Sequence, residues 1–141
     1  MALLDGDIVI AALDILTKDV VHAGSRYCVG GLSTVATRLD RRGQGHGHRL
    51  VQNARETMLQ TGHDLGIFTC DRPLQPFCEH AGWEHLPGAV LLGGTREDPF
   101  PSDQAPFDKV TLGAFFTSVA RRARHTFHGA RIELYLSLIH I

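Results

Sequence analysis

A short loop in the first half of the chain carries residue types that bind phosphate. The loop reads RGQGHG, and its members are Arg42, Gly43, Gln44, Gly45, His46 and Gly47. Glycine has no Cβ, so it reaches positive φ at little cost and lets a ligand approach the backbone closely. Helical periodicity begins directly after the loop, and free N–H groups at a helix N-terminus attract anions. The loop therefore predicts a phosphate site, to which Arg41, Arg42 and Arg49 add positive charge.

The spacing of the glycines excludes two common phosphate motifs. The loop reads GxGxG rather than the dinucleotide pattern GxGxxG, and no Lys-Ser/Thr pair follows the glycines as a Walker loop requires. The pattern that fits is RxxGxG, from Arg42 through Gly45 to Gly47. His46 and His48 have no companion ligands at a recognised metal-binding spacing, so we assign both to the phosphate loop and expect no metal. A tight turn without a ligand is the competing interpretation of these residues.

The loop is framed by a strand and a helix. Apolar residues recur at helical spacing after it, namely Leu50, Val51, Ala54 and Met58, and Gly62 suits the end of this helix. Residues 27–37 predict the preceding strand, in which Gly30 and Gly31 indicate either a bulge or a splayed strand. The order strand, glycine-rich loop and helix is therefore what positions the phosphate site.

The remaining elements form a series of short strands and helices. Residues 3–4 and 8–16 predict a hairpin around the Asp-Gly turn, and Lys18-Asp19 and residues 23–25 predict breaks that delimit a second hairpin. Residues 65–69 predict a buried strand, residues 74–81 a short helix stopped by Gly82, and residues 83–85 an extended segment. Residues 89–95 predict a strand, residues 96–108 a loop, and residues 109–124 a helix with a basic C-terminal end.

Composition limits the class of protein. The chain has 141 residues, of which 43% are hydrophobic, which suffices for one soluble domain. A net charge of −1 argues against nucleic acid as a partner, and no signal peptide or membrane-spanning segment is apparent. The three cysteines, Cys28, Cys70 and Cys78, are widely spaced, which argues against a disulfide scaffold and indicates a reducing cytoplasm.

Two motifs in the right order resemble one enzyme superfamily. The RxxGxG loop resembles the coenzyme A loop of the GCN5-related N-acetyltransferases (GNAT), and Phe77 to Trp83 resembles the family phrase FYxxxGF. The resemblance implies an α/β (α+β) fold with a mixed, mostly antiparallel central sheet that is splayed into a V and flanked by helices. It also implies acetyl-CoA as co-substrate, with its pyrophosphate held by residues 42–48.

A closer resemblance concerns the strand before the loop. Gly30 to Thr37, GGLSTVAT, resembles the strand GYVExVAT of the aminoglycoside 2'-N-acetyltransferase-like branch. Met1 would then fall inside the second strand of the family fold, so the first strand and the first two helices would be missing. We therefore expect a partial acetyltransferase-like domain over residues 1–135, followed by a tail at residues 136–141 that is foreign to it.

The resemblance also implies how each site residue acts. Acyl transfer in this superfamily is direct, so the backbone N–H near Val35 would polarise the thioester carbonyl, while Ala36 and Thr37 pair with the pantetheine arm. Cys78 occupies the position of the Tyr that protonates the leaving thiolate, although a buried Cys is usually a small apolar residue and water could donate instead. Ser33 stands where the branch has Glu, so Asp71 is the substitute candidate for the base.

The sequence therefore predicts an acetyl-CoA-dependent N-acetyltransferase that acts on a small amine, with an aminoglycoside as the branch-specific expectation. Two alternatives stay open, because the expected acid and base are replaced. One is a module that binds CoA or an acyl-CoA without turnover, and the other is an inactive fragment of such an enzyme. We expect no nucleic acid or membrane partner, and a homodimer is compatible with the sequence.

Overall fold

The computed structural model describes residues 2–6, 8–37, 46–95, 97–102 and 109–134. Strands dominate, with one long helix after the third of them. In chain order the elements are β1 (Ala2–Asp5), β2 (Ile8–His22), β3 (Ser25–Thr37), α1 (His46–Gln60), β4 (Leu65–Asp71), η2 (Arg72–Leu74), α2 (Gln75–His80), β5 (Glu84–His85), β6 (Val90–Gly94), β7 (Pro99–Pro101), β8 (Lys109–Phe115), α3 (Ser118–Arg122), η3 (Arg124–Phe127) and β9 (Arg131–Glu133).

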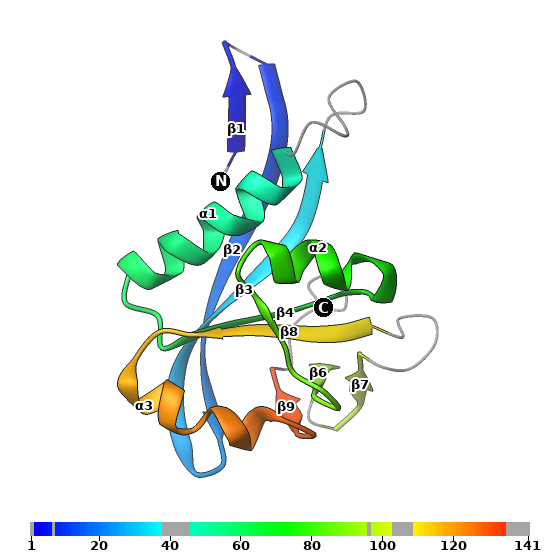
Figure 1. Cartoon of the computed structure of the whole chain (residues 1–141). Helices are drawn as coiled ribbons and strands as arrows, with labels where there is room; N and C mark the ends of the chain where they lie inside the picture. Colours follow the sequence, from blue (N-terminus) through cyan, green and yellow to red (C-terminus); the bar gives the residue numbers. More distant parts are fainter. Residues whose placement is uncertain (1, 7, 38–45, 96, 103–108, 135–141) are drawn as a thin grey trace.

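Two sheets organise these strands. A six-stranded sheet has the order β1-β2-β3-β4-β8-β5, and a three-stranded sheet has the order β7-β6-β9. In the larger sheet β3 and β4 pair in parallel, whereas its other neighbouring strands are antiparallel. Helices α1 and α2 lie over the same side of this sheet (Figure 1). The predicted mixed, mostly antiparallel sheet with flanking helices is therefore confirmed.

The N-terminal hairpins follow the turn signals of the sequence, with one difference. Gly6 has a φ of 61°, and Ala23 and Gly24 have φ values of 49° and 81°, as tight hairpin turns require. The break predicted at Lys18-Asp19 is wrong, because β2 continues through both residues, which pair with Val29 and Cys28. Continuous pairing of β2 with β3 outweighs the weak strand preference of the two charged residues.

The helix predicted over residues 109–124 is also wrong for its first half. Residues 109–115 form β8, which lies between β4 and β5 in the sheet. An inner strand covered on both faces carries a nearly continuous apolar run, and such a run resembles a buried helix in sequence. The helix α3 begins only at Ser118, where the Thr117 hydroxyl accepts a hydrogen bond from the backbone N–H of Ala120. Val119 on this helix is 56% exposed.

Side chains alternate along β4 and β8 between two apolar cores, one on each face of the large sheet. The core under α1 and α2 contains Leu13, Leu32, Leu50, Val51, Ala54, Met58, Phe68, Cys70, Cys78, Ala81, Trp83, Val110, Leu112, Ala114 and Phe116. The opposite core lies against η3 and the small sheet, and it includes Tyr27, Leu65, Ile67, Leu86, Phe115, Phe127 and Ile132. The four predicted apolar residues of α1 all point into the first core.

Asp64, just before β4, ties three segments together. Its carboxylate accepts hydrogen bonds from the Cys28 backbone N–H at 2.8 Å and from the Thr117 hydroxyl at 2.9 Å. Its backbone N–H donates to the Cys28 carbonyl at 2.9 Å, and its carbonyl accepts from the Phe116 N–H at 2.9 Å. Asp64 therefore fixes the start of β4 against β3 and against the end of β8.

We expect Asp64→Ala to lower the free energy of unfolding by about 2–3 kcal/mol, because two donors lose their acceptor in a partly buried place. Asp64→Asn keeps one acceptor oxygen and should cost about half as much. Urea unfolding followed by the fluorescence of the single tryptophan, Trp83, measures both variants. Equal stability of Asp64→Ala and the unmodified chain would contradict this role.

Candidate functional site

The two parallel strands at the centre of the large sheet separate after a short contact. β3 and β4 pair only at Val29 with Leu65 and at Gly30 with Gly66, and then continue to Thr37 and Asp71. Within the described ranges no ladder joins residues 31–37 to β4. The predicted V is therefore present, and this edge of β3 keeps backbone N–H and C=O groups with which an extended ligand can pair.

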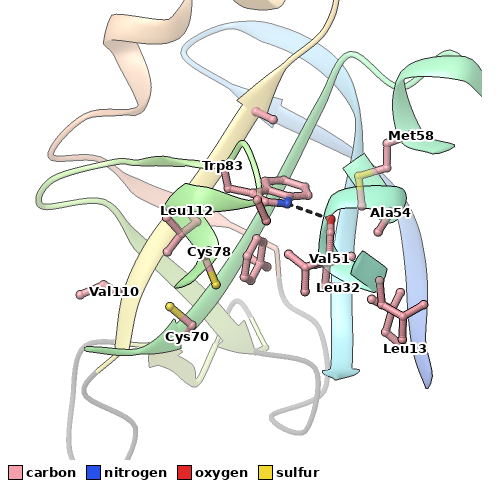
Figure 2. Close-up of a cluster of buried hydrophobic side chains, with 14 of the residues drawn as sticks. Leu13, Leu32, Val51, Ala54, Met58, Cys70, Cys78, Trp83, Val110 and Leu112 are labelled. Atoms are coloured by element: carbon pink, nitrogen blue, oxygen red, sulfur yellow. Dashed lines mark hydrogen bonds between the residues drawn. The ribbon is translucent and has the colours of Figure 1, made fainter. Parts of the chain in front are cut away.

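A pair of glycines forms the vertex of the V. A Cβ on Gly30 would lie 2.8 Å from Met58 Sδ, and one on Gly66 would lie 2.7 Å from the same atom and 2.8 Å from Trp83 Cη2. Met58 on α1 and Trp83 therefore pack directly on the last rung that joins the strands (Figure 2). Of the two interpretations of Gly30 and Gly31, the splayed strand is confirmed.

A bulge does occur in β3, but further along than the glycines. Ala12 pairs with Ala36, whereas Asp14 pairs with Ser33, so the register between β2 and β3 shifts by one residue. β3 therefore has one residue more than β2 in this stretch, which includes Thr34 and Val35. A bulge leaves an extra residue outside the ladder and re-aims its backbone groups. The segment whose N–H is expected to polarise a thioester is thus irregular in its backbone.

The N-terminus of α1 lies at the open end of the V, beside the end of β3 (Figure 1). Residues 38–45 are outside the described residues, so the structure does not place Arg42, Gly43, Gln44 and Gly45. His46 and Gly47 are the first residues of α1, whose first turn contains no acidic side chain. This absence of negative charge suits an anion at the positive end of the helix dipole.

Two contacts join the loop helix to the second motif. The ring of His48 on α1 meets the ring of Phe77 on α2 edge-on, with centroids 5.7 Å apart. The Trp83 Nε1–H donates a hydrogen bond of 3.2 Å to the carbonyl of Val51 on α1 (Figure 2). The helix that follows the RxxGxG loop therefore packs directly against the Phe77-to-Trp83 motif.

The three candidate catalytic residues lie in different surroundings. Cys78 on α2 is buried, and the neighbouring Cys70 thiol together with burial raises its pKa. Asp71, the last residue of β4, is exposed and its Oδ1 lies 3.6 Å from Lys109 Nζ. Ser33 lies on β3 next to the bulge. No described contact links these three residues to one another.

A family model of the acetyltransferase (GNAT) domain matches residues 1–86, which is more than half of the chain. The chain belongs to the GNAT acetyltransferase family. The matched range runs from β1 through β5, so it includes the diverging strands, α1 and the Phe77-to-Trp83 motif of this GNAT domain. A comparison with curated protein sequences gives no significant match.

Solved structures of other acetyltransferases share the fold of this GNAT domain. A GCN5-related N-acetyltransferase from Kribbella flavida has a TM-score of 0.55 at 23% identity, over 61% of this chain and 21% of its own. The GNAT family N-acetyltransferase YhbS from Escherichia coli, solved with CoA, has a TM-score of 0.60 at 16% identity, over 92% of this chain and 62% of its own. A Bacillus subtilis acetyltransferase, also solved with CoA, has a TM-score of 0.52 at 15% identity, over 81% of this chain and 74% of its own. The chain thus spans a minor part of the Kribbella protein and most of the other two.

Among the described residues no group of three or more His, Cys, Asp and Glu side chains is arranged to hold a metal ion. None of the described helices is long and apolar enough to cross a membrane. Sequence reasoning missed two features of the GNAT site. Gly66 gives no signal of its own in a short apolar run, and Cys70 reads only as the end of a strand. Their roles depend on neighbours that are distant in sequence, namely Trp83 and Cys78.

Proposed function

We propose that this domain binds acetyl-CoA between the diverging ends of β3 and β4 and transfers the acetyl group to a small amine. The observation that carries the proposal is the separation of β3 from β4 after Gly30, which leaves one edge of β3 without a strand partner among the described residues. The pantetheine arm would pair with Ala36 and Thr37 at that edge, as an added strand does. Residues 42–48 would hold the pyrophosphate at the start of α1.

The acyl-transfer step needs a backbone N–H that polarises the thioester carbonyl, and groups that accept a proton from the amine and give one to the thiolate. The Val35 N–H, beside the bulge, would polarise the thioester carbonyl while the neutral amine attacks it. The C–N bond forms, the C–S bond breaks, and the thiolate of CoA takes up a proton. Asp71 is the proposed acceptor of the amine proton, directly or through water, and Ser33 would orient the amine. An aminoglycoside is the proposed amine, on the resemblance of residues 30–37 to the branch motif.

Cys78 is a candidate for the proton donor and for a small packing residue, and its surroundings favour the packing role. A thiol whose pKa is raised by a neighbouring thiol and by burial is a weaker proton donor than a free thiol. We therefore expect Cys78→Ala to leave the shape of the pH–rate profile of acetyl transfer unchanged, with water as the donor. A profile that loses its basic limb in this variant would instead assign proton donation to Cys78.

Binding of CoA tests the site independently of turnover. We expect titration with CoA to raise the melting temperature, and Gly45→Val to weaken CoA binding about tenfold or more, because a branched side chain blocks approach to the loop backbone. Gly24→Asn is the control, since it alters a glycine in the β2–β3 turn, at the opposite end of β3 from Thr37, where an added Cβ meets no atom within 4 Å and Asn tolerates the φ of 81°. Equal affinity in Gly45→Val and the control would remove the phosphate-loop argument.

A second candidate function is the binding of CoA or an acyl-CoA without turnover. It is favoured by two replacements: Ser33 stands where the branch has Glu, and Cys78 stands where the family has Tyr. Release of free thiol from acetyl-CoA in the presence of an amine panel, with intact mass of the amines, separates the two functions. Acetylated amine supports the enzyme. CoA binding without thiol release supports the binding module. Because acetyl-CoA is the co-substrate, we propose the cytoplasm as the compartment.

A further inference from the structure

Two cysteines from different elements share the core between β4 and α2. Cys70 lies near the end of β4 and Cys78 lies on α2, and both are free thiols that are 7% and 4% exposed. Both belong to the same buried cluster of side chains. Figure 2 shows the two sulfur atoms beside one another, one on the strand and one on the helix. Two neighbouring thiols on different elements are the arrangement from which a disulfide can form.

The surroundings make the two thiols chemically unequal. The neighbouring Cys78 thiol lowers the pKa of Cys70, with a smaller contribution from Lys109, while burial and the charges of Asp71 and Glu79 oppose this effect. For Cys78 the neighbouring Cys70 thiol and burial both raise the pKa. The thiolate is the reactive form of cysteine, so Cys70 is the nucleophile of the pair and Cys78 holds the proton. Their other neighbours in the core, such as Phe68, Val110 and Leu112, are apolar.

We propose that Cys70 and Cys78 form an oxidation site, which a peroxide converts into a disulfide that joins β4 to α2. The Cys70 thiolate attacks one oxygen of hydrogen peroxide, the O–O bond breaks, and Cys70 becomes a sulfenic acid as hydroxide leaves. The Cys78 sulfur then attacks the Cys70 sulfur, the S–O bond breaks, and the second oxygen leaves as water with the proton of Cys78. In total two thiols are oxidised, and one peroxide is reduced to two molecules of water.

The disulfide changes the helix that carries the second GNAT motif. Cys78 and Phe77 are neighbours on α2, and Phe77 contacts His48 at the start of α1. A bond from Cys78 to β4 fixes α2 on the sheet and removes the Cys78 S–H. The inference stands on the two thiols alone and is independent of whether the domain transfers acetyl groups.

The third cysteine is an internal control. Cys28 lies on β3, and its pKa is raised first by burial and then by the negative charges of Asp19 and Asp64. It belongs to neither core cluster, whereas Cys70 and Cys78 share one. We therefore expect Cys28 to stay reduced at peroxide concentrations that oxidise the other two cysteines.

The experiment uses the reduced full chain, treated with a small excess of hydrogen peroxide and then with an alkylating reagent under denaturing conditions. We expect the oxidised chain to lose the mass of two hydrogen atoms and to take up alkyl label at Cys28 only. Proteolytic peptides should contain a Cys70–Cys78 link that dithiothreitol reverses. The oxidised chain should melt about 5 °C higher, because a cross-link restricts the unfolded chain.

Three variants identify the roles of the two sulfurs. Cys28→Ser should still form the disulfide. Cys78→Ser should accumulate a sulfenic acid at Cys70 that dimedone traps, and Cys70→Ser should form neither product. Alkyl label at all three cysteines, oxygen adducts without a link, or a link that includes Cys28 would each overturn the proposal. The mass, label and peptide measurements on the unmodified chain test the Cys70–Cys78 disulfide even where a variant fails to fold.

Discussion

Gly66→Ala should destabilise this domain by about 3 kcal/mol, a large effect for the addition of one methyl group. The added Cβ would lie 2.7 Å from Met58 Sδ, 2.8 Å from Trp83 Cη2 and 2.9 Å from Trp83 Cζ3. The thioether can rotate away, but the indole is held between α1 and β4 and cannot move without breaking its hydrogen bond to Val51. The cost therefore comes from the rigid ring.

A matched substitution separates this clash from a general cost of replacing glycine in a strand. In Gly31→Ala the new Cβ would approach only the carbonyl oxygen of Ile67, at 3.3 Å, so we expect a change of less than about 1 kcal/mol. Trp83→Phe lacks the two clashing ring atoms and should rescue part of the loss in the Gly66→Ala background, as a double-mutant cycle would show. Equal effects of Gly31→Ala and Gly66→Ala would contradict the packing described for the vertex.

Trp83→Ala should cost about 4 kcal/mol, which is close to the whole stability of a small domain. Trp83 is only 2% exposed, its ring meets Phe68 edge-on at 4.8 Å, and its Nε1–H is bonded to α1. Its removal leaves a cavity between β4 and α1. Circular dichroism during urea unfolding measures the loss, because the variant has no tryptophan.

Trp83→Phe is the control for Trp83→Ala. It keeps most of the ring volume and loses the Nε1–H, so we expect a cost of about 1–2 kcal/mol, from the lost hydrogen bond and a smaller cavity. If Trp83→Ala costs less than Trp83→Phe, the burial of the ring does not hold α1 on the sheet. The order of the two costs is therefore the informative result.

Local patterns in the sequence predict most of the elements that frame the site. The amphipathic face of α1, its end near Gly62, the hairpin at Gly6 and the helix before Gly82 all rest on neighbouring residues, and each is found. Both elements that were predicted wrongly take strand conformation through strand pairing. Lys18-Asp19 pair with the next strand, β3, despite their charge, whereas residues 109–115 pair with β4 and β5, and pairing with distant segments leaves no local signal.

The site itself was predictable in its motifs and not in its contacts. The order of RxxGxG and Phe77-to-Trp83 indicates the family, and the family model matches. The meeting of Gly66 with Trp83 and of Cys70 with Cys78 requires the register of β4 beneath α2, which no short window of sequence contains. The roles assigned to Arg42, Gly43, Gln44 and Gly45 stay predictions, because those residues lie outside the described ranges.

The brevity of the β3–β4 ladder has a consequence for how the domain fluctuates. The large sheet is in effect two antiparallel blocks, β1-β2-β3 and β4-β8-β5, joined by two residue pairs. Each block can keep its own hydrogen bonds if the two pairs break, so the seam between them should be the first part of the sheet to exchange its amide hydrogens. Met58, Trp83 and Asp64 act across this seam and therefore set how often the blocks separate.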